Sequence, residues 1–349
     1  MSRARIAVVG AGWFARLAAI PALVAHPDAD LVAVCDTDEA RVRDTAQEYG
    51  VAHTFTSVAD LVDADVADGV VVAVSQTAHY DVCAQALSAG LHVLVEKPMV
   101  LTAEHAWQLV DLARAGDRIL MVGETFHYPS VSRRVREIVQ SGRLGRLLQI
   151  AGTFNSHTAP LFAGGTAMPD GRGGGYADPA LAGGGQGHTQ ISHLAGLAFW
   201  TTGEAVTEVF GYLDNAGLRV DLVDAIVARL AGGGSLALSA TGTMPEGHPP
   251  RNRLEYYGSD GVLIHDLGKA SASLALPREP AQTFELAEGE PGYPVQAPAR
   301  EFVDLITGRT SDNSAPGDTA ARSVELLDAA YRSAAAGAPV PVGARGLER

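Results

Sequence analysis

The first third of the chain alternates short, continuously apolar runs with segments of helical periodicity. Apolar runs without alternation are typical of strands that are buried on both faces of a parallel sheet. The predicted strands cover Arg5–Val9, Leu31–Cys35, Gly69–Val74, Leu91–Val95 and Arg118–Val122. The predicted helices cover Phe14–Ala25, Glu39–Tyr49, Ala78–Ala89 and Ala103–Ala115. This alternation predicts a doubly wound α/β domain with right-handed crossovers.

From residue 126 onward the pattern changes to a mixture of helices and short strands. Helices are predicted over Pro129–Ser141, Gln190–Thr202, Ala299–Thr307 and Thr319–Ala336, and a Gly- and Pro-rich stretch covers His157–Gly187. Runs with a period of two, joined by tight turns, indicate an antiparallel sheet. The predicted strands are Leu147–Phe154, Val206–Leu213, Leu222–Leu230, Leu236–Thr243, Arg253–Gly258, Val262–Asp266, Ser271–Leu276 and Thr283–Leu286. We therefore expect two domains, residues 1–125 and an α+β domain over residues 126–349.

Composition narrows the class of protein. The 349 residues carry a formal net charge of −14, which disfavours nucleic acid or an anionic membrane as the main partner. The longest apolar stretch, residues 181–203, is interrupted by glycines and histidines, so we do not expect it to span a membrane. The N-terminal segment lacks the pattern of a secretory signal, and the two cysteines, Cys35 and Cys83, stand among apolar neighbours. We expect a cytoplasmic protein with two buried thiols and no metal site.

A glycine-rich turn follows the first predicted strand and opens the first predicted helix. In Gly10-Ala11-Gly12-Trp13-Phe14-Ala15, the first glycine permits the tight turn and the second lets a pyrophosphate approach the backbone. The small Ala15 lets helix and strand pack closely. Free amides and the helix dipole at this point favour phosphate groups. A turn of this kind can also be purely structural, but its place between strand and helix favours a dinucleotide site.

Asp36 ends the second predicted strand, where the ribose-binding acid of a dinucleotide domain belongs. A carboxylate there accepts hydrogen bonds from both ribose hydroxyls and repels a 2′-phosphate. The nearest basic residue downstream is Arg41, so the sequence favours NAD over NADP. The alternative role, a solvated helix N-cap, suits Asp38 better than Asp36.

The triplet Glu96-Lys97-Pro98 stands at the carboxyl end of a predicted buried strand. Ligands bind at this edge in open α/β sheets. A lysine is rarely buried without a partner, so a functional role for Lys97 is favoured over a structural one. Residues 75–79 end another predicted strand at the same edge.

With these pieces together, the chain resembles the glucose–fructose oxidoreductase, inositol dehydrogenase and rhizopine catabolism (Gfo/Idh/MocA) family. The matching segments are GAGWFA, CDTD, SQTAHYDVCAQALSAGLHVLVEKP, VGETFHYP, SGRLGRL, GGGQGHTQISHLAGLAFWTTG and ELLDAAYRSAAAG, in the family's order over nearly the whole chain. The resemblance implies a Rossmann domain, then an α+β domain with a large open, mostly antiparallel sheet. The outer face of that sheet commonly forms subunit contacts, so a homodimer or homotetramer is expected. It also implies a cis peptide bond between Lys97 and Pro98.

The resemblance implies roles for particular residues. Lys97 would lie beside the nicotinamide and contact the reacting hydroxyl, and His193 would act as acid/base. Thr189 stands where relatives have an aspartate, and a threonine cannot serve as a base at neutral pH. An i,i+4 pair shares a helix face, so Thr189 and His193 could both address one substrate carbon. The expected cofactor contacts are Gly10, Gly12, Trp13, Phe14, Ala15, Asp36, Thr37, Ser75, Gln76, His79, Glu96 and Lys97.

Several substrate contacts stay open between functional and structural roles. His127 lies in the segment Glu124–Tyr128, where many relatives have Asn and Arg, which suggests an altered pocket. His188 is expected in the pocket or at the helix entry, and His193 alone would more often be a core histidine. Tyr176 and Arg172 belong to a glycine-rich segment that forms either a substrate loop or a flexible connection.

The leading hypothesis is an NAD-dependent enzyme that transfers a hydride between nicotinamide and a hydroxyl or keto carbon of a sugar, polyol or inositol. One alternative is a glycosidase that retains NAD and works by oxidation, elimination and reduction. The other is a non-catalytic dinucleotide-binding regulator, against which the presence of both Lys97 and His193 argues.

Overall fold

The computed structural model describes residues 3–168, 171 and 173–343. The chain divides into two compact units, which are described separately below. Unit 1 comprises residues 1–125, 166–175 and 295–321, and unit 2 comprises residues 126–165, 176–294 and 322–349. The sequence-based division placed residues 166–175 and 295–321 in the second domain, whereas their contacts group them with the first.

Unit 1 is built on a six-stranded parallel sheet in the order β3-β2-β1-β4-β5-β6. This order confirms the predicted doubly wound sheet. The strands are β1 (Ala4–Val9), β2 (Ala29–Cys35), β3 (His53–Phe55), β4 (Gly69–Val72), β5 (His92–Val95) and β6 (Leu120–Val122). Their inward residues are almost fully buried, as expected for a sheet that is covered on both faces.

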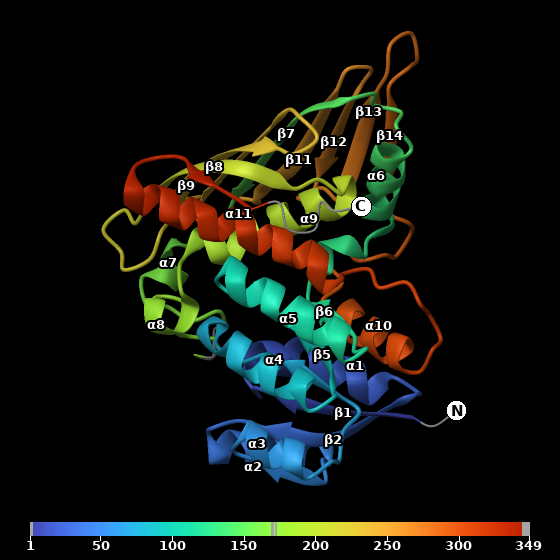
Figure 1. The fold of residues 1–349 in the computed structure, drawn as a ribbon, viewed down its shortest axis with the longest axis vertical. Helices are drawn as coiled ribbons and strands as arrows, with labels where there is room; N and C mark the ends of the chain where they lie inside the picture. The colour runs from blue at the N-terminus through green and yellow to red at the C-terminus, as the bar shows by residue number, and fades with distance from the viewer. Residues whose placement is uncertain (1–2, 169–170, 172, 344–349) are drawn as a thin grey trace. The chain divides into compact units, whose positions relative to one another are not determined.

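The helices of unit 1 connect these strands. They are η1 (Ala15–Ala19), α1 (Ile20–Ala25), α2 (Glu39–Tyr49), α3 (Val58–Asp63), η2 (Gln76–Ala78), α4 (His79–Ser88), α5 (Ala103–Ala115) and η3 (Thr125–His127), the last crossing into unit 2. Helices α4 and α5 lie side by side (Figure 1). The sequence missed β3 and α3, because a three-residue edge strand and a six-residue helix carry too few apolar positions to show a period.

A segment from late in the chain completes unit 1. Helix α10 (Ala297–Ile306) packs against α1 and β5. Gly69 makes room for it, since a Cβ there would lie 3.1 Å from the ring of Phe302. Beyond α10 the chain pairs with β6, where the amide of Val122 donates to the carbonyl of Ala315 at 3.0 Å.

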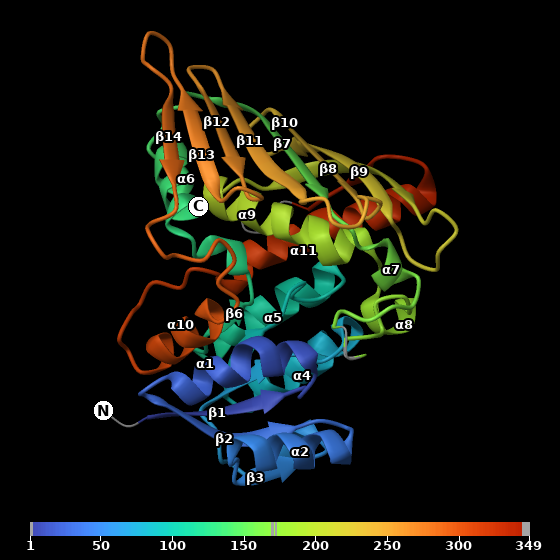
Figure 2. The same cartoon turned by 180° about the vertical axis from the view of Figure 1, so that it is seen from behind.

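Unit 2 contains a nine-stranded sheet in the order β14-β13-β12-β11-β7-β10-β9-β8-β15 (Figure 2). Its strands are β7 (Leu147–Asn155), β8 (Val206–Asp214), β9 (Val223–Leu230), β10 (Ser235–Thr241), β11 (Arg251–Gly258), β12 (Val262–Asp266), β13 (Ser271–Ala275), β14 (Gln282–Glu285) and β15 (Val340–Pro341). All pairings are antiparallel except that of β7 with β10. The predicted mostly antiparallel sheet is therefore confirmed.

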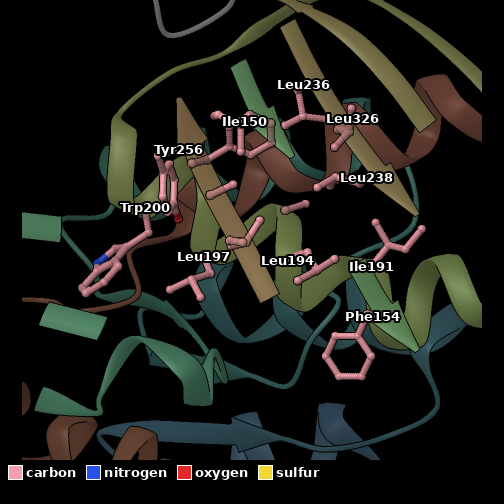
Figure 3. Packing of buried hydrophobic residues seen from close by; sticks show 14 of the residues in the cluster. Ile150, Phe154, Ile191, Leu194, Leu197, Trp200, Leu236, Leu238, Tyr256 and Leu326 are labelled. Atoms are coloured by element: carbon pink, nitrogen blue, oxygen red, sulfur yellow. The ribbon is translucent and has the colours of Figure 1, made fainter. Parts of the chain in front are cut away.

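Helices cover one face of this sheet. They include α6 (Ser130–Gln140), α9 (Ser192–Thr202) and the C-terminal part of α11 (Gly317–Ala336). The short helices α7 (Ala159–Phe162) and α8 (Pro179–Ala182) lie in the glycine-rich stretch. Helix α9 is buried at every position except Thr202. Its Leu194 and Leu197 pack among Ile150, Leu238 and Tyr256 of the sheet (Figure 3). This core holds the start of α9 in place.

The strand β9 shows why one face of the sheet is covered and the other is not. Its residues alternate between exposed and buried along its whole length.

Both cysteines are free and buried, as predicted. No helix in the described part of the chain is long and apolar enough to cross a membrane.

Candidate functional site

The glycine turn of unit 1 has the conformation that a dinucleotide loop requires. Gly10 adopts a φ of +90°, and a Cβ there would lie 2.5 Å from the carbonyl oxygen of Ala73, so only glycine fits. A Cβ on Gly12 would meet nothing within 4 Å, which leaves open space above this backbone. Trp13 and Phe14 follow half-buried, and Ala15 opens η1. The open backbone at Gly12 fits a bound pyrophosphate.

Asp36 is buried at the end of β2 and is tied to this loop. Its carboxylate accepts hydrogen bonds from the amide of Ala11 at 2.9 Å and from the amide of Asp38 at 3.0 Å. The guanidinium of Arg41 lies 3.1 Å from both carboxylate oxygens. Asp38 caps α2, as its alternative role predicted. The structure therefore brings Asp36 and the glycine loop together, and adds Arg41 as a charge partner.

The end of β4 contributes polar groups to the same sheet edge. Gln76 carries a buried side-chain oxygen that has no hydrogen-bond partner among the described residues. Ser75, which precedes Gln76, is exposed, and Thr37 at the end of β2 is exposed as well. A buried amide oxygen without a partner at this edge fits a cofactor group that donates to it.

His79, predicted as a cofactor contact, has a different position. It is 1% exposed, and its Nδ1 lies 2.9 Å from the carbonyl oxygen of Pro98 and its Nε2 3.3 Å from that of Val74. Burial lowers its pKa, although these backbone contacts act in the opposite direction. The imidazole therefore joins the ends of β4 and β5, and we assign it to holding the loop after Lys97. The Lys97–Pro98 bond is cis, as predicted.

Lys97 lies half-buried between two carboxyl groups, those of Glu96 and Glu124. Burial lowers the pKa of the Lys97 ammonium, and the charges of Glu124 and Glu96 oppose this. Burial also raises the pKa of Glu96 to about 7 and that of Glu124 to about 8, with Lys97 acting against both shifts. The raised pKa values of the two glutamates lie near neutral pH, which suits general acid–base chemistry.

In unit 2, the glycine triplet at 183–185 is packed against a buried aspartate. Asp221 accepts hydrogen bonds from the amides of Gly185 at 2.8 Å and Gly187 at 2.7 Å, and from the Tyr331 hydroxyl at 2.7 Å. Burial disfavours its charge, yet these bonds hold the pKa of Asp221 below its ordinary value. A Cβ on Gly185 would lie 2.0 Å from the Asp221 carbonyl oxygen. The triplet is thus required for this packing, which fixes the backbone just before Thr189.

The sequence suggested that Thr189 and His193 share one regular helix, but in the structure they do not. Thr189 lies in the π-helical turn η4 (Gly187–Ile191), and His193 lies in the first turn of α9. Both are nearly buried. They nevertheless follow each other along one continuous helical segment, whose entry is held by Asp221.

His193 sits in an aromatic box within unit 2. The rings of Phe126, Phe154 and Tyr293 surround it, with centroid distances of 5.3, 5.9 and 5.9 Å. Its Nε2 lies 3.4 Å from the Tyr293 hydroxyl. The box fixes the plane of the imidazole, and the half-exposed Tyr293 gives it a polar neighbour.

His188 stacks on Tyr331, with ring centroids 4.3 Å apart. Burial lowers the pKa of His188 to about 4, against the charges of Asp221 and Asp328, so the ring is neutral at neutral pH. Both ring nitrogens are buried and lack a hydrogen-bond partner among the described residues. A buried donor and a buried acceptor without partners favour a polar ligand at this position. This supports a place for His188 in the substrate pocket over a role at the start of the helix.

The remaining predicted substrate contacts lie elsewhere in unit 2. His127 is 1% exposed and stacks on Trp200 with a centroid distance of 4.5 Å, so we leave it out of the proposed site. Tyr176 packs against the small cluster of Phe162, Val220 and Leu222. Arg172 lies outside the described residues.

The sequence analysis did not identify four residues of the candidate site as site residues. Glu124 appeared there only as a departure from the family, and Asp221, Tyr293 and Tyr331 did not appear as site residues. Asp221 and Tyr331 are separated by 110 positions, so no local pattern joins them. The family's glycine triplet was the one available signal, because glycines that exclude a Cβ imply a close neighbour.

Comparisons with known proteins agree with this architecture. Residues 4–124 match the model of the oxidoreductase family with an NAD-binding Rossmann fold, and residues 132–264 match the GFO/IDH/MocA C-terminal domain. A dTDP-3,4-didehydro-2,6-dideoxy-alpha-D-glucose 3-reductase from Streptomyces antibioticus is 33% identical over 158 residues, 45% of this chain and 48% of the relative. D-glucoside 3-dehydrogenase from Escherichia coli K12 is 32% identical over 143 residues, 41% of each chain.

The chain thus spans about half the length of the curated relatives that it matches. Among solved structures, GenD2 from gentamicin A biosynthesis in complex with NAD is 28% identical, with a TM-score of 0.79 over 99% of this chain and 97% of that one. Unit 1 therefore contains an NAD-binding Rossmann domain, and with both domain models matched in order, the chain belongs to the Gfo/Idh/MocA oxidoreductase family.

Proposed function

We propose that this protein is an NAD-dependent oxidoreductase that acts on a secondary hydroxyl or keto carbon of a sugar. The observation that carries the proposal is Lys97, half-buried between two carboxyl groups at the carboxyl edge of an NAD-binding sheet. The names of two relatives specify carbon 3 of a hexose-type ring, which supports carbon 3 as the reacting position.

The chemistry divides between cofactor and protein. When bound, NAD supplies the hydride acceptor. In the oxidative direction the C–H electron pair of the alcohol leaves as hydride, and the hydroxyl proton passes to a base of the protein. Lys97 is proposed to accept this proton as the neutral amine, the form that its burial favours. His193 is proposed as the second acid/base, and Thr189 and His188 as groups that bind substrate hydroxyls.

A fluorescence assay for NADH against a panel of substrates tests the proposal. The panel contains methyl glucosides, dTDP-hexoses, free sugars and inositols, each supplied with NAD. We expect NADH formation with at least one sugar that has a free 3-hydroxyl. Release of a sugar from a glycoside without net NADH would instead support the glycosidase alternative. Firm NAD binding with no reaction across the panel, in either direction, would contradict the proposal.

Cofactor preference follows from Asp36. We expect wild-type protein to bind NAD(H) more tightly than NADP(H) by about tenfold or more, since a buried carboxylate faces the added phosphate. Asp36→Ser should narrow this gap, because it also releases Arg41 toward a 2′-phosphate. Isothermal titration of both cofactors measures the effect. In Asp36→Ser/Arg41→Ala the gain for NADP(H) should disappear, and equal affinities in the wild type would refute the assignment.

We further propose that the open face of the unit 2 sheet joins two copies of the chain. Tyr212 and Val227 are 70% and 51% exposed on neighbouring strands β8 and β9, and Phe210 pairs with Val227 in register. Exposed apolar side chains gathered on one sheet face are typical of an interface.

Introducing charge on this face should separate the copies. Tyr212→Glu/Val227→Glu is expected to weaken self-association about 100-fold, because unpaired buried charges cost several kcal/mol. Light scattering after size exclusion measures the mass. Leu181→Glu, at another exposed apolar position, serves as the control and should leave the mass unchanged. A wild-type monomer, or an unchanged assembly in the double variant, would contradict this interface.

A cytoplasmic location is part of the proposal and is supported by the two buried free thiols.

A further inference from the structure

The residue Glu124 lies next to Lys97 because of the sheet register. Strands β5 and β6 pair in parallel, with Val95 opposite Val122. The chain leaves β5 as Glu96-Lys97 and leaves β6 as Gly123-Glu124. Since parallel neighbours end at the same edge, the two carboxyl groups and the amine come together there.

The packing of this edge shields Glu124 from solvent more than its two neighbours. A Cβ on Gly123 would lie 2.7 Å from Oε2 of Glu96, so the Glu96 carboxyl occupies the space directly before Glu124. Glu124 itself is 3% exposed. The charged groups that act on Glu124 include Lys97 and Glu96. Those that act on Lys97 include Glu124 and Glu96.

One ammonium faces two carboxyl groups at this edge, the buried one of Glu124 and the half-buried one of Glu96. Because Glu124 is buried, a second negative charge at this edge is costly. The protonation states of the three groups are therefore coupled, and removal of one group changes the proton affinity of the others. The raised pKa values of both glutamates, about 7 and about 8, agree with this.

We propose that Glu124 is a positioning residue for Lys97, whose carboxyl controls when the Lys97 amine carries a proton. The inference rests on the proposed function for its catalytic meaning. A carboxylate beside the amine favours the ammonium form. Glu124 therefore sets the pH above which Lys97 can accept the proton of the substrate hydroxyl.

The protein offers an unusually clean test, because Lys97 and Lys269 are its only two lysines. The side chain of Lys269 is 81% exposed and serves as an internal reference. Competitive labelling with trace acetic anhydride at a series of pH values, read by mass spectrometry, gives the reactivity of each amine. The high-pH plateau reports access to the reagent, and the midpoint reports the proton affinity of Lys97. No substrate is needed, so failure of the substrate panel does not decide this experiment.

In Glu124→Gln, we expect the Lys97 midpoint to fall by about one pH unit, the lower end of the effect of a nearby opposite charge. Labelling of Lys97 relative to Lys269 then rises about tenfold near neutral pH. Glu124→Asp keeps the charge at a shorter reach and should move the midpoint less. If Glu124→Gln does not fold, Glu124→Asp decides the test, because coupling between the two side chains must still lower the Lys97 midpoint in that variant. Glu301→Gln, a carboxyl of α10 that binds the amide of Ser314, is the control and should change nothing.

Two results would overturn the proposal. One is a Lys97 midpoint that stays the same in every folded Glu124 variant. The other is a change confined to the plateau, which would show that Glu124 affects only access to Lys97. Once a substrate is known, the acidic limb of the kcat/KM profile should move with the labelling midpoint, which a merely structural role would not produce.

Discussion

Lys97→Ala and His193→Ala are each expected to lower turnover by about 10²–10⁴-fold, the usual contribution of a positioned acid/base. Lys97 is the amine whose pKa burial lowers, and His193 is the imidazole held by three aromatic rings. Removing either takes away one of the two proposed acid/base groups through which the hydroxyl proton passes. Steady-state kinetics on the substrate found in the panel, with NAD affinity measured separately, checks the prediction.

The binding data separate chemistry from cofactor binding. NAD affinity should hardly change in His193→Ala and should weaken somewhat in Lys97→Ala, since the family resemblance places that lysine beside the nicotinamide. Lys269→Ala removes the other lysine and should retain full turnover. Thr189→Ala should mainly raise KM, because a hydroxyl binds substrate but hardly takes its proton. Near-native turnover in His193→Ala together with loss in Thr189→Ala would show that the base is misassigned, and His188 would be the next candidate.

Gly185→Ala is expected to destabilise unit 2 by about 4 kcal/mol or more. The added Cβ would lie 2.0 Å from the carbonyl oxygen of Asp221, and backbone cannot move aside as a flexible side chain can. The shift would also disturb the hydrogen bonds from the Gly185 and Gly187 amides to the Asp221 carboxylate. Thermal unfolding followed by circular dichroism should show a midpoint lower by about 10 °C, or no folded protein at all.

The matched control is Gly116→Ala at the end of α5. Its Cβ would lie no closer than 3.4 Å to any neighbour, and its φ is −86°, so it tolerates a side chain. This variant should unfold within about 2 °C of the wild type. If Gly185→Ala unfolded at the wild-type temperature, the account of the triplet as a packing requirement for Asp221 would be wrong.

The extent to which the sequence predicts this protein depends on how local each signal is. The boundaries of α2 and α5 follow from apolar period and caps alone, and both helices lie where they were predicted. The return of α10 and residues 311–316 to unit 1 has no local signature, because it depends on packing against α1 and pairing with β6.

The candidate site divides in the same way. The glycine turn, Asp36 and Lys97 could be found because each stands at the end of a predicted strand. Asp36 was expected to face the ribose, and its contacts with Ala11 and Arg41 appear only in three dimensions. His127 and His79 show contacts that the sequence did not predict. A histidine in a family segment suggests chemistry, but stacking on Trp200 and backbone carbonyl contacts account for these two.

The central claim is that a hydride moves between a sugar carbon and the nicotinamide of NAD bound to unit 1. Its most direct test uses the best substrate of the panel with deuterium on the carbon that carries the reacting hydroxyl. We predict that one deuterium per turnover appears on carbon 4 of the nicotinamide in the NADH formed, as measured by mass spectrometry and proton NMR. Product formation with unlabelled NADH, or with deuterium lost to water, would contradict the account.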